Sequence, residues 1–487
     1  MQSIWNHETE FSKREALKGR IETDTAVIGG GLAGVLIAFF LQQQGIPAVV
    51  LEANRIGSGQ TRNTTAKITC QHGLIYDKLI RQFGIERARQ YALANQSAIE
   101  TYRRIVQEQH IDCDLETLPA YLYSNADPDA LRREAEAANR LGIAADFTMD
   151  TALPFPVKGA LRFDNQAQFH PLKFLRHIAD HVTIYERTSV QTISGNTIQT
   201  KHGTVHAKHI VFASHFPFVN FPGLYFARMH QERSYVVALR QAQRLDGVYL
   251  GIDANGISFR NAGNLLLLGG GSHRTGLNTD GGQYATLRHH AQKWYPNSTE
   301  IAYWSAQDCM PIDGIPFIGQ YARSKPNWFV ATGFQKWGMT SSMVSAQLIG
   351  DLIGGKHSEY AAIFSPQRFR LRASAKNLSA NIRQFTKGVL TSTFAIPRST
   401  PTTLPVGCGK IVSVNGKRVG AYKDSSGTVH LVSARCPHLG CALAWNPEER
   451  SWDCPCHGSR FDYTGRLISG PAQTNITLSD KIQTKPQ

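Results

Sequence analysis

The sequence has little acidic charge and no long apolar run. It contains 52 Lys and Arg against 37 Asp and Glu, which gives a formal net charge of +15. Its longest apolar stretch, residues 26–41, is interrupted by glycines and is too short to span a bilayer. The first residues also lack the basic and then apolar pattern of a signal peptide. We therefore expect a cytoplasmic protein without a transmembrane segment.

The excess of basic residues could indicate a nucleic-acid or anionic-membrane partner. These residues are scattered along the chain, however, and no aromatic-basic repeat of the RNA-binding type occurs. We therefore expect no nucleic-acid partner. An acidic cofactor, substrate or electron-transfer partner fits the charge equally well.

Cysteine is scarce, with 8 residues in 487. So few thiols in so long a chain do not make the disulfide framework of a small secreted domain. Their placement is more informative, because half of them fall in one short window near the C-terminus while the others are scattered. Clustered thiols in a cytosolic chain indicate a metal site. The clustered residues are Cys436, Cys441, Cys454 and Cys456.

The length of the chain predicts two or three domains. Near its start, a strand at 25–28, an apolar helix at 32–44 and a strand at 48–51 form one βαβ unit. Helical spacing of apolar residues between 74 and 109 predicts one or two helices. Alternating stretches between 183 and 214 predict antiparallel hairpins. The first three quarters are therefore predicted to be α/β with an inserted antiparallel sheet.

Later segments predict a strand, a connector and a separate module. Residues 265–268 are apolar and precede three glycines, which predicts a buried strand that ends in a tight loop. From 364 to about 400 the chain is basic and polar, which is typical of a connector. Short strands separated by turn residues follow, and they predict an all-β module. The connector contains Arg368, Arg370, Arg372, Lys376, Arg383 and Lys387, and the strands are expected at 410–414, 418–422 and 429–432.

Residues 29–34, Gly-Gly-Gly-Leu-Ala-Gly, match the dinucleotide-binding pattern G-x-G-x-x-G. Gly29 permits the tight turn, Gly31 lets the backbone approach a pyrophosphate, and Gly34 lets helix and strand pack closely. Glu52 ends the next predicted strand, where its carboxylate can accept both ribose hydroxyls. A glycine-rich turn in an unrelated α/β protein is the alternative, and this full context argues against it. Spacing alone does not separate FAD from NAD.

Three segments in the same order resemble the D-amino-acid-oxidase-like flavoproteins, which include glycine, sarcosine and gamma-glutamylputrescine oxidases. The first is the fingerprint with Glu52, and the second is the small-residue stretch 57–67, which we term the second flavin loop. The third comprises 311–319 and 330–340, and it is similar to the closing segment that faces the flavin pyrimidine in that family. The likeness extends from residue 22 to about residue 370.

This resemblance implies a bound FAD, an antiparallel substrate domain, and oxidation of a C–N bond by hydride transfer to the flavin. FAD-binding segments are expected at about 22–75, 160–220 and 305–360. Asn63 stands nearest to the flavin-linking His of some relatives, and Cys309 is offset from the linking Cys, so we expect noncovalent FAD. The expected cofactor-binding residues are Gly29, Gly31, Gly34, Glu52, Ser58, Thr61, Thr65, Ala66, Val190, Gly333, Gly338, Met339 and Thr340.

The same resemblance suggests substrate contacts, although it does not identify catalytic residues. Arg260, His273 and Lys336 lie in segments that line the front face of the flavin in relatives. Arg260 could pair with a substrate carboxylate through a bidentate fork. A purely structural arginine is the alternative.

Two short loops near the C-terminus carry a set of metal ligands. Cys436 and His438 form a C-x-H pair, and Cys454 and His457 form a C-x-x-H pair. Two cysteines and two histidines can hold tetrahedral zinc, or a [2Fe–2S] cluster with both cysteines on one iron and both histidines on the other. Spacing alone leaves both options open.

The residues around these ligands resemble the Rieske proteins, because the loops read C-P-H-L-G-C and C-P-C-H-G-S. The resemblance favours a [2Fe–2S] cluster over zinc. It also implies a disulfide between Cys441 and Cys456, with two reduced thiols as the alternative. Ser459 matches the serine that stabilises the reduced cluster, whereas Phe461 replaces the tyrosine of high-potential proteins. We therefore predict a midpoint potential below that of the respiratory type.

A flavin and a Rieske cluster on one chain predict an electron relay. An amine or amino acid would reduce FAD, and the electrons would pass to the cluster and on to an external redox protein, quinone or other enzyme. One alternative is a reductase fed by NAD(P)H, for which a second nucleotide fingerprint is missing. Another is a non-enzymatic redox sensor or RNA-associated factor. The domains are expected at 1–370 for FAD and substrate, 371–400 for the linker and 401–487 for the Rieske domain.

Overall fold

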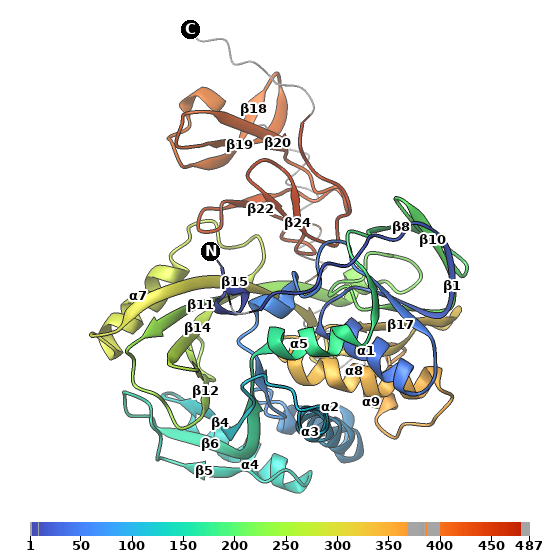
Figure 1. Cartoon of the computed structure of the whole chain (residues 1–487). Coiled ribbons are helices and arrows are strands. Elements are labelled where there is room, and N and C mark those ends of the chain that lie inside the picture. Colours follow the sequence, from blue (N-terminus) through green and yellow to red (C-terminus); the bar gives the residue numbers. More distant parts are fainter. Residues whose placement is uncertain are drawn as a thin grey trace.

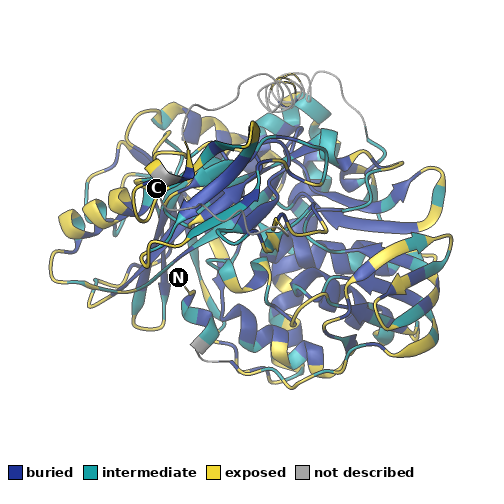
Figure 2. Ribbon diagram, turned by 90° about the horizontal axis from the view of Figure 1, so that it is seen from above, coloured by how far each residue is buried: buried dark blue, intermediate teal, exposed yellow. Residues whose placement is uncertain are grey.

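The computed structural model describes residues 2–7, 9–368 and 400–478, together with Ser379, Asn381, Arg383 and Thr386. These residues form a large α/β body that carries a smaller all-β module, drawn in orange and red in Figure 1. Within this described part, we find no helix long and apolar enough to cross a membrane. The sheets of the body are largely buried, and exposed residues gather on loops and outer helices (Figure 2).

The first sheet has eight strands in the order β16-β17-β10-β1-β2-β7, with the β8–β9 hairpin attached to β10. Strand β1 pairs in parallel with both β2 and β10, which is the arrangement that a βαβ unit produces. The strands predicted at 25–28 and 48–51 and the hairpins predicted between 183 and 214 are confirmed. The bounds are β1 Gly19–Ile28, β2 Ala48–Leu51, β7 Thr183–Tyr185, β8 Val190–Ser194, β9 Thr197–Thr200, β10 Gly203–Phe212, β16 Phe317–Ala322 and β17 Lys325–Thr332.

Helices cover this sheet because parallel strands need crossover connections. Helix α1 is apolar on almost every side and packs beside α8, so both helices are buried in one core. The helices predicted from 32 onward and between 74 and 109 are confirmed as α1, α2 and α3. The bounds are α1 Leu32–Gln43, α2 Tyr76–Phe83, α3 Ile85–Glu108, α4 Pro128–Arg140, α5 Pro171–Asp180, α6 Tyr225–Arg228, α7 Gln283–Trp294, α8 Gly338–Ile353 and α9 Ala361–Phe364, with 3-10 turns η1 Ile4–His7 and η2 Gln60–Asn63.

The second sheet has nine strands in the order β15-β11-β14-β13-β12-β4-β6-β3, with β5 paired to β6. All its pairs are antiparallel except β12 with β4, as expected for the substrate domain. The bounds are β3 Lys67–Ile68, β4 Glu116–Ser124, β5 Asp146–Thr148, β6 Gly159–Gln168, β11 Met229–Arg240, β12 Val248–Gly251, β13 Ser258–Ala262, β14 Leu265–Arg274 and β15 Thr299–Pro311.

The tight loop predicted after residue 268 is wrong, because β14 continues through the three glycines to Arg274. Gly269 pairs with Val236 on β11 and with Ser258 on β13. A Cβ on Gly269 would lie 2.7 Å from the Ser258 hydroxyl oxygen, so the glycine reflects close approach of a neighbouring strand. Pairing on both sides outweighs the preference of glycine for turns.

The C-terminal module is all-β, as predicted, and consists of two small antiparallel sheets. One contains the three strands expected from the sequence, and the other carries the loops with the cluster ligands. The bounds are β18 Gly409–Val414, β19 Lys417–Lys423, β20 Val429–Ser433, β21 Ala444–Asn446, β22 Ser451–Asp453, β23 Arg460–Asp462 and β24 Leu467–Ser469, with a 3-10 turn η3 Pro401–Thr403.

The connector start predicted at residue 364 is wrong, because residues 364–368 belong to the body. The linker start predicted at 371 lies outside the described residues. Phe364 is buried in the main core. The Arg368 guanidinium binds the Asp313 carboxylate through two hydrogen bonds of 2.8 and 3.0 Å. Both side chains are buried, so Arg368 fastens the end of the body. Arg383 is exposed, whereas Arg370, Arg372, Lys376 and Lys387 lie outside the described residues.

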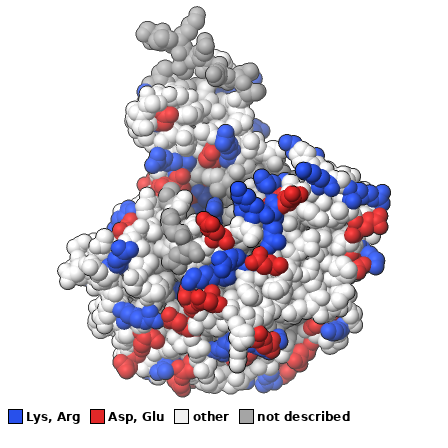
Figure 3. Space-filling model, in the orientation of Figure 1, with Lys and Arg blue, Asp and Glu red and all other residues white. Residues whose placement is uncertain are grey.

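Charge is not concentrated on the face shown in Figure 3, where basic and acidic side chains are interspersed over the body. Surface ion pairs such as Arg81 with Asp77 and Arg103 with Glu100 also occur. The pattern agrees with the scatter of basic residues along the sequence.

Candidate flavin and iron–sulfur sites

The turn between β1 and α1 has no room for side chains. A Cβ on Gly34 would lie 2.0 Å from the Gly29 carbonyl oxygen, and one on Gly29 would lie 2.5 Å from that of Ala213. Gly29 also has a φ of +116°, which favours glycine. At Gly31 the nearest neighbour of a Cβ would be the Thr61 hydroxyl, at 3.3 Å. The turn therefore presents its backbone and the positive end of the α1 dipole, which fits the pyrophosphate of FAD.

Glu52 follows β2, and two backbone N–H groups hold its carboxylate. Gly30 donates to Oε2 and Asn54 donates to Oε1, each at 2.7 Å. Burial raises the pKa of this carboxyl, and the two hydrogen bonds oppose that shift. The Thr188 N–H donates to the Glu52 carbonyl at 2.8 Å, which brings the start of β8 at Val190 to the same edge. Contact of Glu52 with ribose hydroxyls stays a prediction.

The second flavin loop lies against the start of α1. The Thr61 hydroxyl oxygen accepts a hydrogen bond of 3.0 Å from the first N–H of that helix. Ala66 is fully buried with a φ of +53°, and the Thr65 carbonyl accepts a hydrogen bond from Arg260. Ser58 lies in the turn before η2, where its N–H donates to the Arg55 carbonyl at 3.1 Å. The loop is therefore fixed at both its ends.

A buried histidine joins this loop to the closing segment. The His72 ring stacks on Trp337, with centroids 4.7 Å apart and planes 15° apart. Burial lowers the pKa of His72 to about 3, so the ring is neutral. Its Nε2–H donates to the Thr69 carbonyl at 2.7 Å, and its Nδ1 accepts from the Tyr91 hydroxyl at 2.6 Å. The Thr340 hydroxyl lies 3.1 Å from the same Nε2.

The closing segment turns sharply into α8. Gly333 has a φ of +74°, and a Cβ there would lie 2.6 Å from Pro311. Helix α8 begins at Gly338, and the Met339 carbonyl accepts a hydrogen bond of 2.9 Å from the Tyr102 hydroxyl. The predicted helix through residue 352 is confirmed. Its N-terminus carries the positive end of a helix dipole, which stabilises negative charge on a reduced flavin placed there.

Arg260 is buried and its donors are used within the protein. Nε donates to the Gln168 side chain at 3.0 Å, Nη2 donates to the Phe169 carbonyl at 2.8 Å, and Nη1 donates to the Thr65 carbonyl. Its guanidinium also lies over the Trp5 ring, 5.0 Å from the centroid. These contacts support the structural alternative and give no support to a carboxylate fork.

The two other candidate substrate contacts lie in different surroundings. His273 Nε2 lies 3.0 Å from the Tyr235 hydroxyl, and its Nδ1 lies 2.9 Å from a backbone carbonyl. Lys336 Nζ lies 3.0 Å from the Ser272 hydroxyl and 3.5 Å from the Asp308 carboxylate. Lys336 also raises the local positive potential at Lys67, at the end of the second flavin loop. Burial, followed by the charges of Arg260 and Lys336, lowers the pKa of Lys67 to about 7.

The four predicted cluster ligands form two close pairs, each with one member on each loop of the module. His438 Nδ1 and His457 Nδ1 face each other at 3.2 Å. The thiols of Cys436 and Cys454 are both buried, and a hydrogen bond between them is the main cause that lowers the pKa of Cys436. Two imidazoles and two thiols, paired across two loops, are the donor set of a Rieske cluster. The residues present therefore fit the [2Fe–2S] group.

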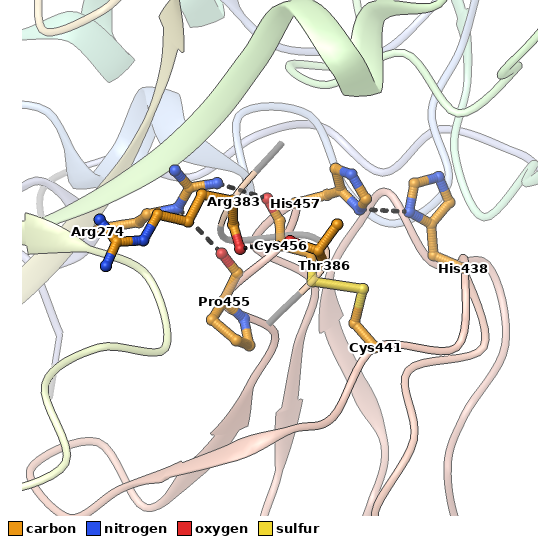
Figure 4. The surroundings of a disulfide bond; sticks show 8 residues. All are labelled: Arg274, Arg383, Thr386, His438, Cys441, Pro455, Cys456 and His457. Carbon is orange, nitrogen blue, oxygen red and sulfur yellow. Dashed lines mark hydrogen bonds between the residues drawn. A yellow bond between two sulfur atoms is a disulfide. The ribbon is translucent and has the colours of Figure 1, made fainter. Parts of the chain in front are cut away.

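Cys441 and Cys456 form a disulfide that ties the two loops together, as the resemblance implied (Figure 4). Both residues are buried, which shields the bond from reductants. The sulfur of Cys454 lies within 4.8 Å of both. Since the first two sulfurs are bonded to each other, only Cys454 of the three is available as a ligand. Ser459 is fully buried beside Cys436, and Phe461 is fully buried in the same core.

The histidine edge of the cluster loops faces the body. His438 Nε2 donates to the Asn220 side-chain oxygen at 2.8 Å. Phe226 in α6 makes edge contacts with the rings of His438 and His457, at centroid distances of 6.3 and 5.7 Å. Arg274 at the end of β14 donates to the backbone carbonyls of residues 455 and 456, each at 3.0 Å (Figure 4).

A buried ion-pair network joins the module to the body on another side. The Glu449 carboxylate accepts a hydrogen bond of 2.7 Å from Arg233 on β11 and also binds Arg460 of the module. Arg460 in turn binds Asp453 at 3.0 Å. All four side chains are almost fully buried. Such a network makes separation of the two parts costly, because it would leave charges unpaired.

Several residues at these sites were not predicted from the sequence. Trp5 lies in the polar lead-in, yet its indole N–H donates to the Thr64 carbonyl at 2.7 Å. Lys67 ends the second flavin loop, and its position after a run of small residues is the only local signal of a role. Asn220, Gln231 and Gln307 contact the module from the body, and no pattern near them indicates this role.

The sequence profile of the family described as FAD dependent oxidoreductase matches residues 24–352, and that of the Rieske [2Fe-2S] domain matches residues 400–483. The chain is 39% identical over 492 residues to the Rieske 2Fe-2S iron-sulfur protein YhfW of Bacillus subtilis. That alignment covers 97% of this chain and 96% of the relative.

Solved structures share the fold of the body. Glycine oxidase from Geobacillus kaustophilus superposes with a TM-score of 0.57 at 21% identity, covering 72% of this chain and 99% of that one. L-Proline dehydrogenase from P. horikoshii gives 0.61 at 17% identity, covering 72% and 98%. The chain therefore belongs to the DAO family of FAD-dependent oxidoreductases, binds FAD, and carries a C-terminal Rieske domain that binds a [2Fe–2S] cluster.

Proposed function

We propose that the protein is an amine or amino-acid dehydrogenase whose electrons leave through the Rieske cluster. The observation that carries this proposal is the orientation of the module. The histidine edge of its cluster loops faces the body at Asn220 and Phe226 instead of facing solvent. A cluster edge held against the flavin-binding body is suited to exchange electrons with that body.

The proposed substrate class rests on the family and on the chemistry of the site. The fold neighbours are a glycine oxidase and an L-proline dehydrogenase by name. FAD in such a site accepts a hydride, so the substrate C–N bond becomes C=N and the substrate loses two electrons. Since Arg260 is used within the protein, Lys67 and Lys336 are the cations that we propose to attract a substrate carboxylate.

The relay also requires an acceptor outside the chain. Two electrons leave the substrate together, whereas a [2Fe–2S] cluster takes one at a time, so each electron must leave the cluster before the next arrives. A one-electron acceptor, such as a small redox protein or a quinone, fits this need. We propose on this basis that the enzyme is a dehydrogenase and that oxygen is not its main oxidant.

The test is anaerobic titration of the purified holoprotein with a panel of amines and amino acids. Flavin bleaching is followed by absorbance, and the reduced cluster is followed by its EPR signal. We expect one substrate class to bleach the flavin and then to produce the reduced-cluster signal. If NAD(P)H reduces both centres and no amine does, the protein is a reductase and the proposed direction of electron flow is wrong. If neither donor reduces the flavin, a non-enzymatic role replaces this proposal.

A further inference from the structure

A chain of hydrogen bonds connects the second flavin loop to the second cluster loop. The Gln307 backbone N–H donates to the Gln60 side-chain oxygen in η2 at 2.9 Å. The Gln307 side-chain amide donates to the Gly458 carbonyl at 2.7 Å and to the Gln231 side-chain oxygen. The Gln231 amide in turn donates to the carbonyl of His457, a cluster ligand, at 2.7 Å. Four hydrogen bonds therefore link the flavin-binding loop to a ligand residue.

The two central glutamines are built into the sheet. Gln231 on β11 is 1% exposed and Gln307 on β15 is 0% exposed. The strands pair in antiparallel register, and Gln231 is opposite Cys309, two residues along from Gln307. Residues two apart on a strand point to the same face, so both amides reach the module from one face of the sheet. Buried amides are costly unless they are hydrogen-bonded, and both of these amides donate to the module.

The close approach of the second cluster loop to β11 also depends on particular residues. Gly458 follows His457 directly and has a φ of +80°. A Cβ on Gly458 would lie 2.6 Å from the Gln231 Cβ, so only glycine allows the cluster loop to approach β11 this closely. Gly276, after β14, is similarly close, since its Cβ would lie 2.7 Å from the Pro455 nitrogen. The backbone of the cluster loop therefore lies directly against the Gln231 side chain and against the chain after β14.

We propose that Gln231 and Gln307 are positioning residues that hold the second cluster loop at a fixed distance from the second flavin loop and thereby set the rate of electron transfer between FAD and the cluster. This inference rests on the part of the proposed function in which electrons pass between the two groups, and it does not depend on the substrate. In each transfer one electron leaves reduced FAD and reduces one ferric ion of the cluster. A one-electron acceptor outside the chain then removes that electron before the second follows.

Other contacts allow the glutamines to be tested without undocking the module. The Arg274 hydrogen bonds go to the backbone of residues 455 and 456 and involve neither amide. The Arg233–Glu449 ion pair also holds the module, although Arg233 donates to the Gln307 side-chain oxygen at 3.4 Å as well. Asn278 supplies a matched control, because its amide donates to Glu448 of the module at 3.3 Å, away from the ligand residues. Removing the amide of Asn278 or Gln307 costs one hydrogen bond to the module, and removing that of Gln231 costs two, to His457 and Gly470. Of these three amides, those of the glutamines contact the second cluster loop.

The experiment uses the full-length holoprotein and reduces the flavin by light with an artificial donor, so no substrate is needed. Cluster reduction is then followed by absorbance in Gln307→Met, Gln231→Met and Asn278→Ala. We expect both glutamine variants to slow cluster reduction by about tenfold or more, since small errors in position cost large factors in rate. Asn278→Ala should keep the wild-type rate. The midpoint potentials and EPR spectra of the cluster should be unchanged in all three variants. A slower rate would then result from a changed distance between the two groups and not from a changed driving force.

Gln60→Ala is a second test that leaves the core intact, because Gln60 is only partly buried and lies at the flavin end of the chain. It should slow transfer in the same direction at equal FAD content. If Gln307→Met and Gln231→Met reduce the cluster at the wild-type rate, the inference is overturned. It is also overturned if the cluster of the wild-type protein stays oxidised after the flavin is photoreduced. If amines fail to reduce the flavin but photoreduction shows the expected slowing, the inference stands and the proposed substrate class fails.

Discussion

His438 donates a hydrogen bond from Nε2 to the Asn220 side-chain oxygen across the boundary between the module and the body, at 2.8 Å. The Nδ1 of the same ring faces Nδ1 of His457, the other predicted histidine ligand, at 3.2 Å. Asn220 therefore fixes the orientation and tautomer of a predicted cluster ligand from outside the module. An acceptor on the outer nitrogen of a ligating histidine makes the ring a stronger donor to the metal.

Replacing Asn220 by Leu removes this acceptor, and we expect the midpoint potential of the cluster to rise. Loss of a hydrogen bond worth about 1 kcal/mol to the oxidised state corresponds to roughly 40 mV for a one-electron couple. Asn220→Asp should lower the potential instead, because a carboxylate is the stronger acceptor. An EPR-monitored redox titration measures both. Shifts of the same sign in the two variants would contradict the role assigned to Asn220.

Glu449 supplies the clearest prediction for stability. Burial alone would raise the pKa of its carboxyl, but Arg233 and Arg460 outweigh burial and lower the pKa to about 2. The folded pKa thus lies below the ordinary value of 4.5, so this stabilisation is present above pH 4.5 and is lost as the pH falls toward 2. We expect acid to loosen the module in that window, as detected by limited proteolysis.

The matching substitution is Glu449→Gln, which leaves two buried guanidinium groups without their shared carboxylate. We expect the free energy of unfolding to fall by about 3 kcal/mol or more. Glu448→Gln is the control, since Glu448 is only partly buried and accepts from Asn278 and the Tyr284 N–H, and its loss should cost about 1 kcal/mol. Thermal unfolding of both variants at neutral pH checks this order. Equal losses in the two would show that the ion-pair network adds nothing.

The parts of the molecule that could be predicted from the sequence lie in short contiguous segments. The requirement for Gly34 arises within a few residues, since a Cβ there would lie 2.0 Å from the Gly29 carbonyl oxygen. Likewise Cys436, His438, Cys454 and His457 must sit at set spacings on two loops to meet at one point. Residue type and spacing therefore predict the kind of site, and the resemblance to known families predicts which cofactors bind there.

The parts that could not be predicted depend on contacts far apart along the chain. Asn220 and Gln231 meet the cluster loops across separations of 218 and 226 residues, and an isolated Asn or Gln on a loop or strand carries no local signal. In the sequence, Arg368 cannot be distinguished from the basic residues of the connector. Its ion pair with Asp313 shows that it belongs to the body. Strand β14 likewise continues through its three glycines because it pairs with β11 and β13, which are not adjacent to those glycines in the sequence.

We predict that Arg260 stabilises the fold and does not bind the substrate. Arg260→Gln removes donors to the carbonyls of Thr65 and Phe169, and we expect it to lower the free energy of unfolding by about 3 kcal/mol and to weaken FAD retention. Flavin content and thermal unfolding measure these effects. The KM for an amino-acid substrate, measured on the FAD-loaded fraction, should change little. A large rise in KM at full flavin content would instead assign Arg260 to the substrate carboxylate.

Lys67 predicts a pH dependence of substrate capture. Burial and the charges of Arg260 and Lys336 lower its pKa to about 7, so the side chain is protonated below that pH and neutral above it. If Lys67 attracts a substrate carboxylate, the apparent substrate affinity in anaerobic flavin reduction should fall as the pH rises through about 7. Lys67→Arg keeps its charge over this range, so its apparent substrate affinity should stay high at every pH. Lys67→Met has no charge, so its affinity should stay low at every pH. A Lys67→Met variant with the wild-type pH profile would assign the titration to another group, and Lys336, which lies 3.5 Å from the Asp308 carboxylate, would be the next to replace.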